Sequence, residues 1–271
     1  MSQTTPEFRL EPGYEFPPEE ITVSEADQHQ KHAFCDMPPE RYGDVVDPTF
    51  LARRTILLNT DAIQACRPDC APVHIVHRLK VHAPVRLGET VTMTGTYIAI
   101  PEISRGWVTK SRWEFHRADG THVLTVEPDV MMMDPSKAPD GKKKGGRKER
   151  PADDEAGFET LLEKQCTPDT TLGYCEGTTN LIHTVPEVAK EYGFRAPIIA
   201  GNQTVNFLLE ALALDGVPAE MDVELKFLKP VFWDDAVKVQ GRRDGGVLTG
   251  LRAVNGDGET VATGIVNSVR Y

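Results

Sequence analysis

The side chains with the clearest capacity for chemistry lie between residues 174 and 201. His183 carries an imidazole, which titrates near neutral pH and can serve as general acid and general base. Asn180 precedes it by three residues, and its amide could hold the ring or a water molecule. The hydroxyl of Thr178 could orient the same water, but it does not ionise near neutrality. These residues predict acid–base catalysis centred on His183.

A second group of candidates would bind a substrate. Gly201 and Asn202 begin a strongly apolar segment that we expect to be helical. A helix N-terminus presents unpaired N–H groups, which could polarise a carbonyl group as negative charge develops on it. Asp36 and Glu176 are candidate carboxylates for the same site. His32, one helical turn before Asp36, is a candidate partner for that carboxylate.

The stretch 174–201 has the sequence YCEGTTNLIHTVPEVAKEYGFRAPIIAG. It resembles the motif of the MaoC-like family of (R)-specific enoyl-CoA hydratases. In that motif Ser-Gly-Asp leads into Asn-Pro-(Leu/Ile)-His, followed by Asp-Pro, Ala, Gly-Phe and Pro-Ile-(Leu/Ala)-His-Gly. The residues that match in order and spacing are Gly177, Asn180, Ile182, His183, Pro186, Ala189, Gly193, Phe194, Pro197, Ile198 and Gly201. The resemblance extends to the rest of the second half, whereas the first half resembles the family's non-catalytic N-terminal repeat only loosely.

Three positions depart from the motif. The family's catalytic aspartate falls on Thr178, the acid after the catalytic histidine on Val185, and the histidine before the final glycine on Ala200. The resemblance implies hydration of a trans-2-enoyl-CoA or dehydration of a 3-hydroxyacyl-CoA, with one water held between an aspartate and a histidine. It implies no cofactor beyond the CoA that carries the acyl group. The missing aspartate indicates replacement by Glu176 or Asp36, an altered mechanism, or a substrate that supplies its own carboxylate.

Two other functions stay open at this point. Some hot-dog chains keep the fold, lose the acid–base pair and act as a degenerate partner subunit of an active MaoC-like chain. Others are acyl-CoA thioesterases, which commonly place an acid near the central helix. Asp61 and Glu210 are the acids available in the two apolar segments expected to be helical, and Glu210 lies far from the start of its segment.

The elements that position these residues follow an internal repeat. At an offset of 146, the residues Leu79, Lys80, Pro84, Val85, Val91 and Gly95 match Leu225, Lys226, Pro230, Val231, Val237 and Gly241. Further on, Arg117-Ala118 and Asp119-Gly120 resemble Arg252-Ala253 and Asp257-Gly258. Earlier in the chain, the segment 45–48 resembles 183–186, which would place Val45 where the second half has His183. The first half would then lack the catalytic histidine.

Each half combines one helix with an antiparallel meander. Apolar spacing predicts helices over residues 49–65 and 202–214, and the second segment is apolar nearly all round, which is typical of a buried helix. Alternating and β-branched segments predict the strands 74–83, 90–100, 107–116 and 122–133, then 222–228, 236–242, 246–254 and 259–269. The predicted fold class is α+β: a tandem (double) hot-dog, in which each half wraps an antiparallel sheet around a central buried helix.

A polar segment divides the chain almost in half. Residues 134–156 are rich in Pro, Gly and Lys, so we expect a charged flexible linker there. The predicted domains are an N-terminal hot-dog repeat over 1–133 and a C-terminal MaoC-like repeat over 157–271. Fold-level analogy favours a homodimer, or a hetero-oligomer with a related hot-dog chain.

Composition narrows the partners. The net charge of −11 disfavours nucleic acid and anionic membranes as partners. The resemblance implies an acyl-CoA-type small molecule as the substrate. The N-terminal segment lacks a secretory signal, and five cysteines without paired spacing suggest reduced thiols, so we expect a cytoplasmic protein. His74 and His82 would share one strand face and His77 the other. This predicts solvated or edge-strand histidines rather than a metal site.

Overall fold

Eleven strands join one antiparallel sheet in the computed structural model, which describes residues 7–137 and 156–271. The first half supplies β1 (Glu15–Thr22), β2 (Ala71–Val81), β3 (Thr90–Ala99), β4 (Glu102–Ile103), β5 (Gly106–His116) and β6 (His122–Met133). The second half supplies β7 (Phe158–Gln165), β8 (Glu220–Phe227), β9 (Ala236–Asp244), β10 (Val247–Asn255) and β11 (Thr260–Arg270). The strand order is β1-β3-β5-β6-β2-β8-β11-β10-β9-β7, and β4 pairs with β5.

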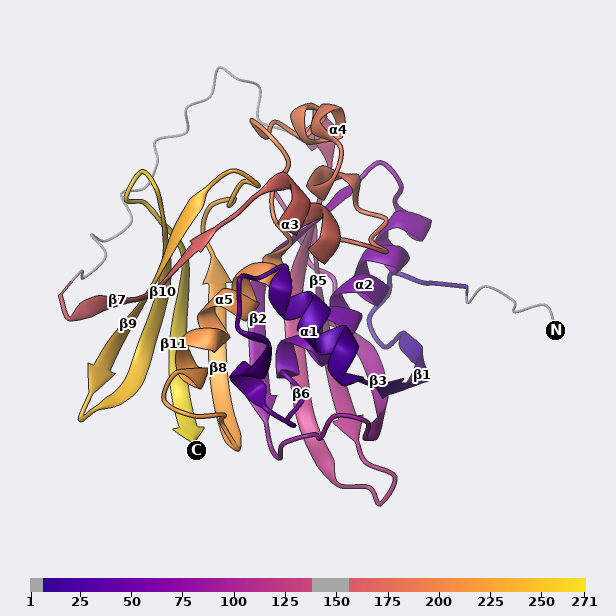
Figure 1. Cartoon of the computed structure of the whole chain (residues 1–271). Coiled ribbons are helices and arrows are strands. Elements are labelled where there is room, and N and C mark those ends of the chain that lie inside the picture. Colours follow the sequence, from indigo (N-terminus) through magenta and orange to yellow (C-terminus); the bar gives the residue numbers. More distant parts are fainter. Residues whose placement is uncertain (1–6, 138–155) are drawn as a thin grey trace.

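The two halves meet where β2 pairs with β8, near the middle of this sheet (Figure 1). On either side the order of the strands is the same, so the two halves are repeats related by an approximate two-fold axis. The sheet runs without interruption from one repeat into the other. The offset of 146 is confirmed at Arg86 and Phe232, which bridge the equivalent residues Val45 and Ile198 in the two repeats.

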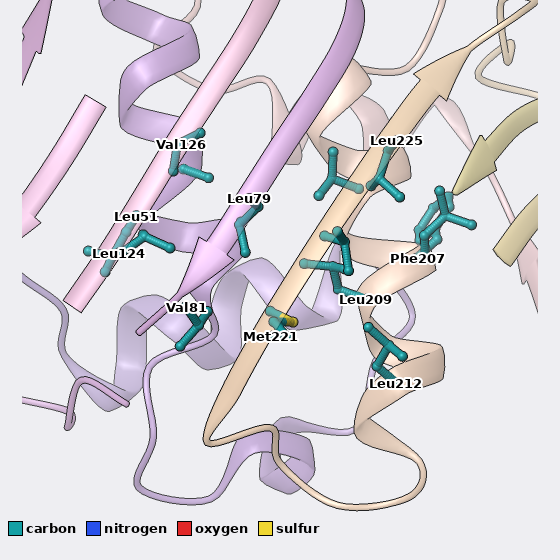
Figure 2. Packing of buried hydrophobic residues seen from close by; sticks show 14 of the residues in the cluster. Leu51, Leu79, Val81, Leu124, Val126, Phe207, Leu209, Leu212, Met221 and Leu225 are labelled. Carbon is teal, nitrogen blue, oxygen red and sulfur yellow. The ribbon is translucent and has the colours of Figure 1, made fainter. Parts of the chain in front are cut away.

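Two long helices fill the concave side of the sheet. α2 (Pro48–Cys66) begins at Asp47, whose side chain accepts a hydrogen bond from the Thr49 N–H, and Pro48 suits the first turn. α5 (Gly201–Ala213) is buried along nearly its whole length, and the two helices contact each other. Figure 2 shows Leu79 and Val81 of β2 beside Met221 and Leu225 of β8, with the apolar side chains of α5 packed nearby. Each such buried side chain contributes about 1.5–3 kcal/mol to stability.

Three shorter helices lie outside this core: α1 (Glu25–Ala33), α3 (Pro168–Tyr174) and α4 (Pro186–Glu191). α1 and α3 occupy equivalent places, since Ser24 caps one and Thr167 caps the other. Each repeat has a 3-10 turn before its central helix, Pro39–Tyr42 before α2 and Leu181–His183 before α5, and α4 is an additional helix of the second repeat. Most of the predicted linker falls on residues 138–155, which lie outside the described residues.

Two of the sequence alignments between the halves were wrong. The segment 45–48 leads into the central helix α2, so its counterpart is 198–201 before α5 and not 183–186. Val45 is therefore equivalent to Ile198 and not to His183. Gly120 and Gly258 do occupy equivalent turns. However, the N–H of Gly120 donates to Arg117 and the N–H of Gly258 donates to Asn255, so Arg117 is equivalent to Asn255. The match of Arg117-Ala118 with Arg252-Ala253 was therefore out of register.

Candidate active site

The segment before α5 holds the predicted catalytic residues. It packs on a small apolar cluster in which Ile182, Ile198 and Ala71 are buried. The N–H of Ile198 donates to the carbonyl of Ile182, and Ile198 bridges Phe232 at the end of the sheet. These contacts fix the 3-10 turn Leu181–His183 beside the first residues of α5.

The hydrogen bonds of His183 define its tautomer. Nδ1 lies 2.8 Å from the carbonyl oxygen of Ile198, and because a carbonyl only accepts, Nδ1 carries the proton. Nε2 is then unprotonated, and its lone pair accepts a hydrogen bond from the Asn180 amide, whose Nδ2 lies 3.2 Å away. The same Nδ2 also donates to the carbonyl of Pro72 on β2 at 2.8 Å, which fixes the orientation of the amide. A backbone carbonyl of the first repeat therefore orients Asn180, a candidate catalytic residue of the second repeat.

His183 is neutral in this setting. The residue is half-buried, because protein atoms pack around the ring and the rest of its surface lines a cavity. Burial lowers the pKa of His183 to about 4, with a smaller opposing effect from the Ile198 carbonyl. At neutral pH the ring can therefore accept a proton at Nε2, provided that the reacting water displaces the Asn180 N–H from that lone pair.

A cavity of about 230 Å³ brings the predicted residues together. His183, Asn180, Thr178, Gly201 and Asn202 all line it, as expected from the motif. Its walls are mainly apolar. Its lining includes the basic residues Arg53, Arg105 and Lys229, but no aspartate or glutamate among the described residues. The position of the family's aspartate is occupied by the Thr178 hydroxyl, which accepts from the Asn180 N–H at 3.2 Å.

Neither proposed replacement carboxylate reaches the cavity. Asp36 is exposed after the end of α1, with a positive φ of 50°, and is not among the lining residues. Glu176 is also exposed and absent from the lining, although its backbone carbonyl accepts from Arg53. His32 does not pair with Asp36. It lies 3.2 Å from the buried carboxylate of Asp47, which already caps α2.

The N-terminus of α5 opens on the cavity. Ala200, Gly201 and Asn202 all line it, and no side chain caps this helix. Its first N–H groups therefore have no intrahelical acceptor and are available to a bound carbonyl. The Asn202 side chain donates to the Thr49 carbonyl and the Tyr174 hydroxyl, which fixes its orientation. Its Oδ1 is buried without a partner.

His74 also lines the cavity, which the sequence did not predict. A register shift between His74 and Val76 in the β2–β6 pairing interrupts the two-residue alternation of the strand. His74 and His77 therefore lie together, with His77 Nδ1 3.3 Å from His74 Nε2. His74 is 9% exposed and His77 is fully buried, so the expectation of solvated or edge-strand histidines was wrong.

The acids considered for a thioesterase also lie outside the cavity lining. Glu210 is buried within α5 and forms an ion pair with the buried Lys164, at 2.6 Å. Arg41 lies 3.7 Å from its other oxygen. Asp61 on α2 accepts a hydrogen bond from the Thr179 hydroxyl. Glu210 therefore serves as a buried structural charge and does not reach a substrate in this cavity.

The first repeat has a filled counterpart of this cavity. A space of only about 20 Å³ is lined by Val45, Val46 and Pro48 before α2 and by Pro84 and Val85 after β2. These residues are equivalent to Ile198, Ile199, Gly201, Pro230 and Val231 in the lining of the large cavity. The volume is too small for a substrate, so the site is formed once per chain.

No helix in 7–137 and 156–271 is long and apolar enough to cross a membrane. Within the same ranges, no cluster of three or more His, Cys, Asp or Glu side chains could hold a metal ion. All five cysteines are free thiols.

One continuous sheet built from two repeats, each with its own central helix, defines the class of this protein: a double hot-dog. Residues 151–264 match the family described as MaoC like domain. This match covers most of the second half of the chain, the same half in which the motif around His183 resembles the MaoC-like family. No curated protein is significantly similar to the chain in sequence.

Solved structures share the whole architecture. HtdX of Mycobacterium tuberculosis aligns with a TM-score of 0.73 at 16% identity, covering 92% of this chain and 99% of that one. A MaoC-like dehydratase from Phytophthora capsici aligns with a TM-score of 0.69 at 17% identity, over 94% and 95% of the two chains. A further M. tuberculosis protein described as having a double hot-dog fold aligns at 0.58 and 16% identity, over 95% and 96%. At these identities the similarity establishes the fold.

Proposed function

We propose that this protein hydrates an enoyl-CoA thioester, or dehydrates the corresponding 3-hydroxyacyl-CoA, with His183 as general base and acid. One observation carries the proposal: a neutral His183 with an unprotonated Nε2 lines the same cavity as the uncapped N-terminus of α5. A base and a set of carbonyl-polarising donors are the two groups that this reaction needs. The proposed chemistry uses no cofactor beyond the CoA that carries the substrate.

The proposed hydration proceeds without a carboxylate. Water, oriented by the Thr178 hydroxyl and the Oδ1 of Asn202, transfers a proton to Nε2 of His183 as its oxygen bonds to C3. The π electrons move toward the thioester oxygen, and the N–H groups of Gly201 and Asn202 stabilise the resulting enolate. The protonated His183 then returns the proton to C2. The Ile198 carbonyl keeps the imidazole in place through Nδ1, while the Asn180 amide gives up Nε2 to the water and keeps its bond to Pro72.

The lining of the cavity supports a CoA thioester as substrate. Its apolar walls suit an acyl chain, and Arg53, Arg105 and Lys229 supply positive charge for phosphate groups on an otherwise acidic protein. Arg53 is held in place by the carbonyls of Tyr174 and Glu176. Asp36, predicted as a substrate-binding residue, has no part in the proposed site because it lies outside the cavity lining.

The decisive experiment incubates the purified protein with a short trans-2-enoyl-CoA. Loss of the enoyl-thioester absorbance and release of free thiol are followed in parallel. We expect absorbance to fall without thiol release, and the rate to fall at least 100-fold in His183→Ala, about the contribution of one general acid–base residue. His29→Ala, a half-buried histidine on α1 outside the cavity lining, is the matched control.

The other outcomes separate the alternative functions. Thiol release that exceeds hydration would favour a thioesterase, although the ion pair of Glu210 argues against the usual acid. No reaction at any chain length would contradict the proposal and favour a partner subunit, whose activity would appear on addition of a related hot-dog chain.

A further inference from the structure

We propose that His74, from the first repeat, binds the substrate carbonyl by donating its Nδ1–H, and that His77 holds the tautomer that this requires. The inference rests on the proposed thioester site. It assigns a direct contact with substrate to a residue outside the motif of the second repeat.

The position of His74 is the first argument. A Cβ built on Gly201 would lie 2.7 Å from Cβ and 2.8 Å from Nδ1 of His74. The imidazole therefore lies directly against the first residue of α5, and glycine at position 201 leaves it the necessary space. Nδ1 is consequently close to the helix N–H groups that polarise a carbonyl. His74 and Gly201 line the same cavity.

The unpaired nitrogen atoms are the second argument. His74 Nδ1 and His77 Nε2 are both buried without a hydrogen-bond partner, while His77 Nδ1 and His74 Nε2 bond to each other. Two neutral tautomeric arrangements satisfy this bond. In one, His77 donates and His74 carries its proton on Nδ1. In the other, His74 donates and His77 carries an orphaned N–H on Nε2.

The surroundings select the first arrangement. His77 is fully buried and is not among the residues that line the cavity, so an N–H on its Nε2 would have no acceptor from a ligand. Buried orphan N–H groups are rarer and costlier than buried orphan acceptors. With the proton on His74 Nδ1, the unpaired donor instead belongs to a residue that lines the cavity, next to Gly201. Burial lowers the pKa of His74 to about 4, because the Val76 backbone and the Asp129 carboxylate raise it by less than burial lowers it. The ring is therefore neutral at pH 7.

The unpaired Oδ1 of Asn202 indicates where the water or the hydroxyl of the substrate would bind. Asn202 Oδ1 is buried without a partner, and the bond from its Nδ2 to the Thr49 carbonyl fixes it as an acceptor. A carbonyl oxygen cannot bind there, but a water or a hydroxyl can. The cavity thus offers one unpaired side-chain donor for the thioester carbonyl and one acceptor for the water, on neighbouring elements.

The test uses a 2,4-dienoyl-CoA, whose conjugated thioester reports hydrogen bonding to its carbonyl by a red shift in absorbance. We expect a red shift on binding to the wild-type protein. His74→Phe keeps a ring and loses the donor, so the shift should disappear and kcat for hydration should fall about 100-fold, with KM within a few-fold. His74→Asn places an amide N–H near the position of Nδ1 and should restore much of the shift. His82→Phe, one residue beyond the end of β2 and outside the cavity lining, is the matched control.

A red shift that persists in a folded His74→Phe protein would overturn the inference, as would its absence in the wild type. Imidazole ¹⁵N spectra of the wild-type protein test it without any substitution: a proton on Nε2 of His74 would overturn it. If the red shift depends on His74 but no hydration occurs, the inference stands and the proposed hydratase function fails. If hydration occurs at the same rate in His74→Phe, the function stands and the inference fails.

Discussion

Arg78 and Glu224 form an ion pair across the junction between the repeats, with Nε of Arg78 2.9 Å from Oε2 of Glu224. They are directly opposite each other in the β2–β8 pairing and lie 146 residues apart, which is the offset of the sequence repeat. Each residue therefore faces its own counterpart. The approximate two-fold axis passes between them, and substitution has made the two equivalent positions complementary in charge.

The same offset relates Gly95 on β3 to Gly241 on β9, but their surroundings differ. A Cβ on Gly95 would lie 2.2 Å from the ring of the fully buried Trp113, whereas one on Gly241 would meet the methyl ends of Leu248 and Leu161 at 2.5 and 2.6 Å. Leucine ends can rotate, and a packed indole cannot. We expect Gly95→Ala to lower the free energy of unfolding by about 3 kcal/mol or more and Gly241→Ala by about 1 kcal/mol. Urea denaturation measures both, and equal losses would contradict the argument.

Thr178→Asp should raise hydratase activity. Thr178 lines the cavity with His183, at the position where the family has its catalytic aspartate. A carboxylate there would share the reacting water with Nε2, and we expect kcat to rise at least tenfold. Thr178→Asn has nearly the same shape without the charge and is the control. A gain shared by Asn would show that shape, and not a base, was responsible.

Asn180→Asp should raise the pKa of His183. The substitution puts a carboxylate about where Nδ2 now lies, 3.2 Å from Nε2, and a nearby negative charge favours the protonated ring. The new side chain also loses its bond to the Pro72 carbonyl, so the protein should lose about 1–3 kcal/mol of stability. NMR titration of His183 checks the shift, with Asn180→Leu as the uncharged control. A pKa that stays near 4 in the Asp variant would refute the assigned geometry.

Stability should fall as the pH is lowered from about 6.5 to about 4. Burial lowers the pKa values of His74 and His183 to about 4, while histidine in the unfolded chain titrates near 6.5. Within this window the unfolded chain binds protons that the folded protein does not, so the free energy of unfolding decreases with falling pH. Each histidine contributes about 1 kcal/mol per pH unit. Denaturation at pH 7, 6 and 5 should show a shallower slope in His183→Gln, and an unchanged slope there would count against a buried neutral ring.

Glu210→Gln should destabilise the protein without abolishing turnover. The change leaves Lys164, only 4% exposed, without its carboxylate, and an uncompensated buried charge costs about 3–5 kcal/mol. The double variant Lys164→Met, Glu210→Leu should recover most of the loss. Loss of thioester cleavage in a folded Glu210→Gln protein would instead give this acid the catalytic role that its position argues against.

The sequence was most informative where its pattern was strong. The helices around Leu51 and Leu208 were predicted, as were the strands β2, β3, β5, β6 and β8 to β11, because their apolar faces repeat over many residues. β1, β7, α1 and α3 were not, since short segments with polar exposed faces carry little periodicity. The residues that the motif selected, Thr178, Asn180, His183 and Gly201, line one cavity. The motif could not locate His74, because the register shift between His74 and Val76 that turns this side chain toward the cavity is not visible in the order of polar and apolar residues in the sequence.

The small closed pocket of the first repeat has a consequence for which substitutions this protein can tolerate. In a dimer of identical repeats every substitution appears twice, so a residue that supports one site must also be tolerated at the other. In the fused chain a substitution appears once. Tyr42 and Val46 can close one pocket while Ile199 and Ala200 keep the other open. The two halves have thereby become specialised, and neither half alone contains the complete set of side chains around the cavity.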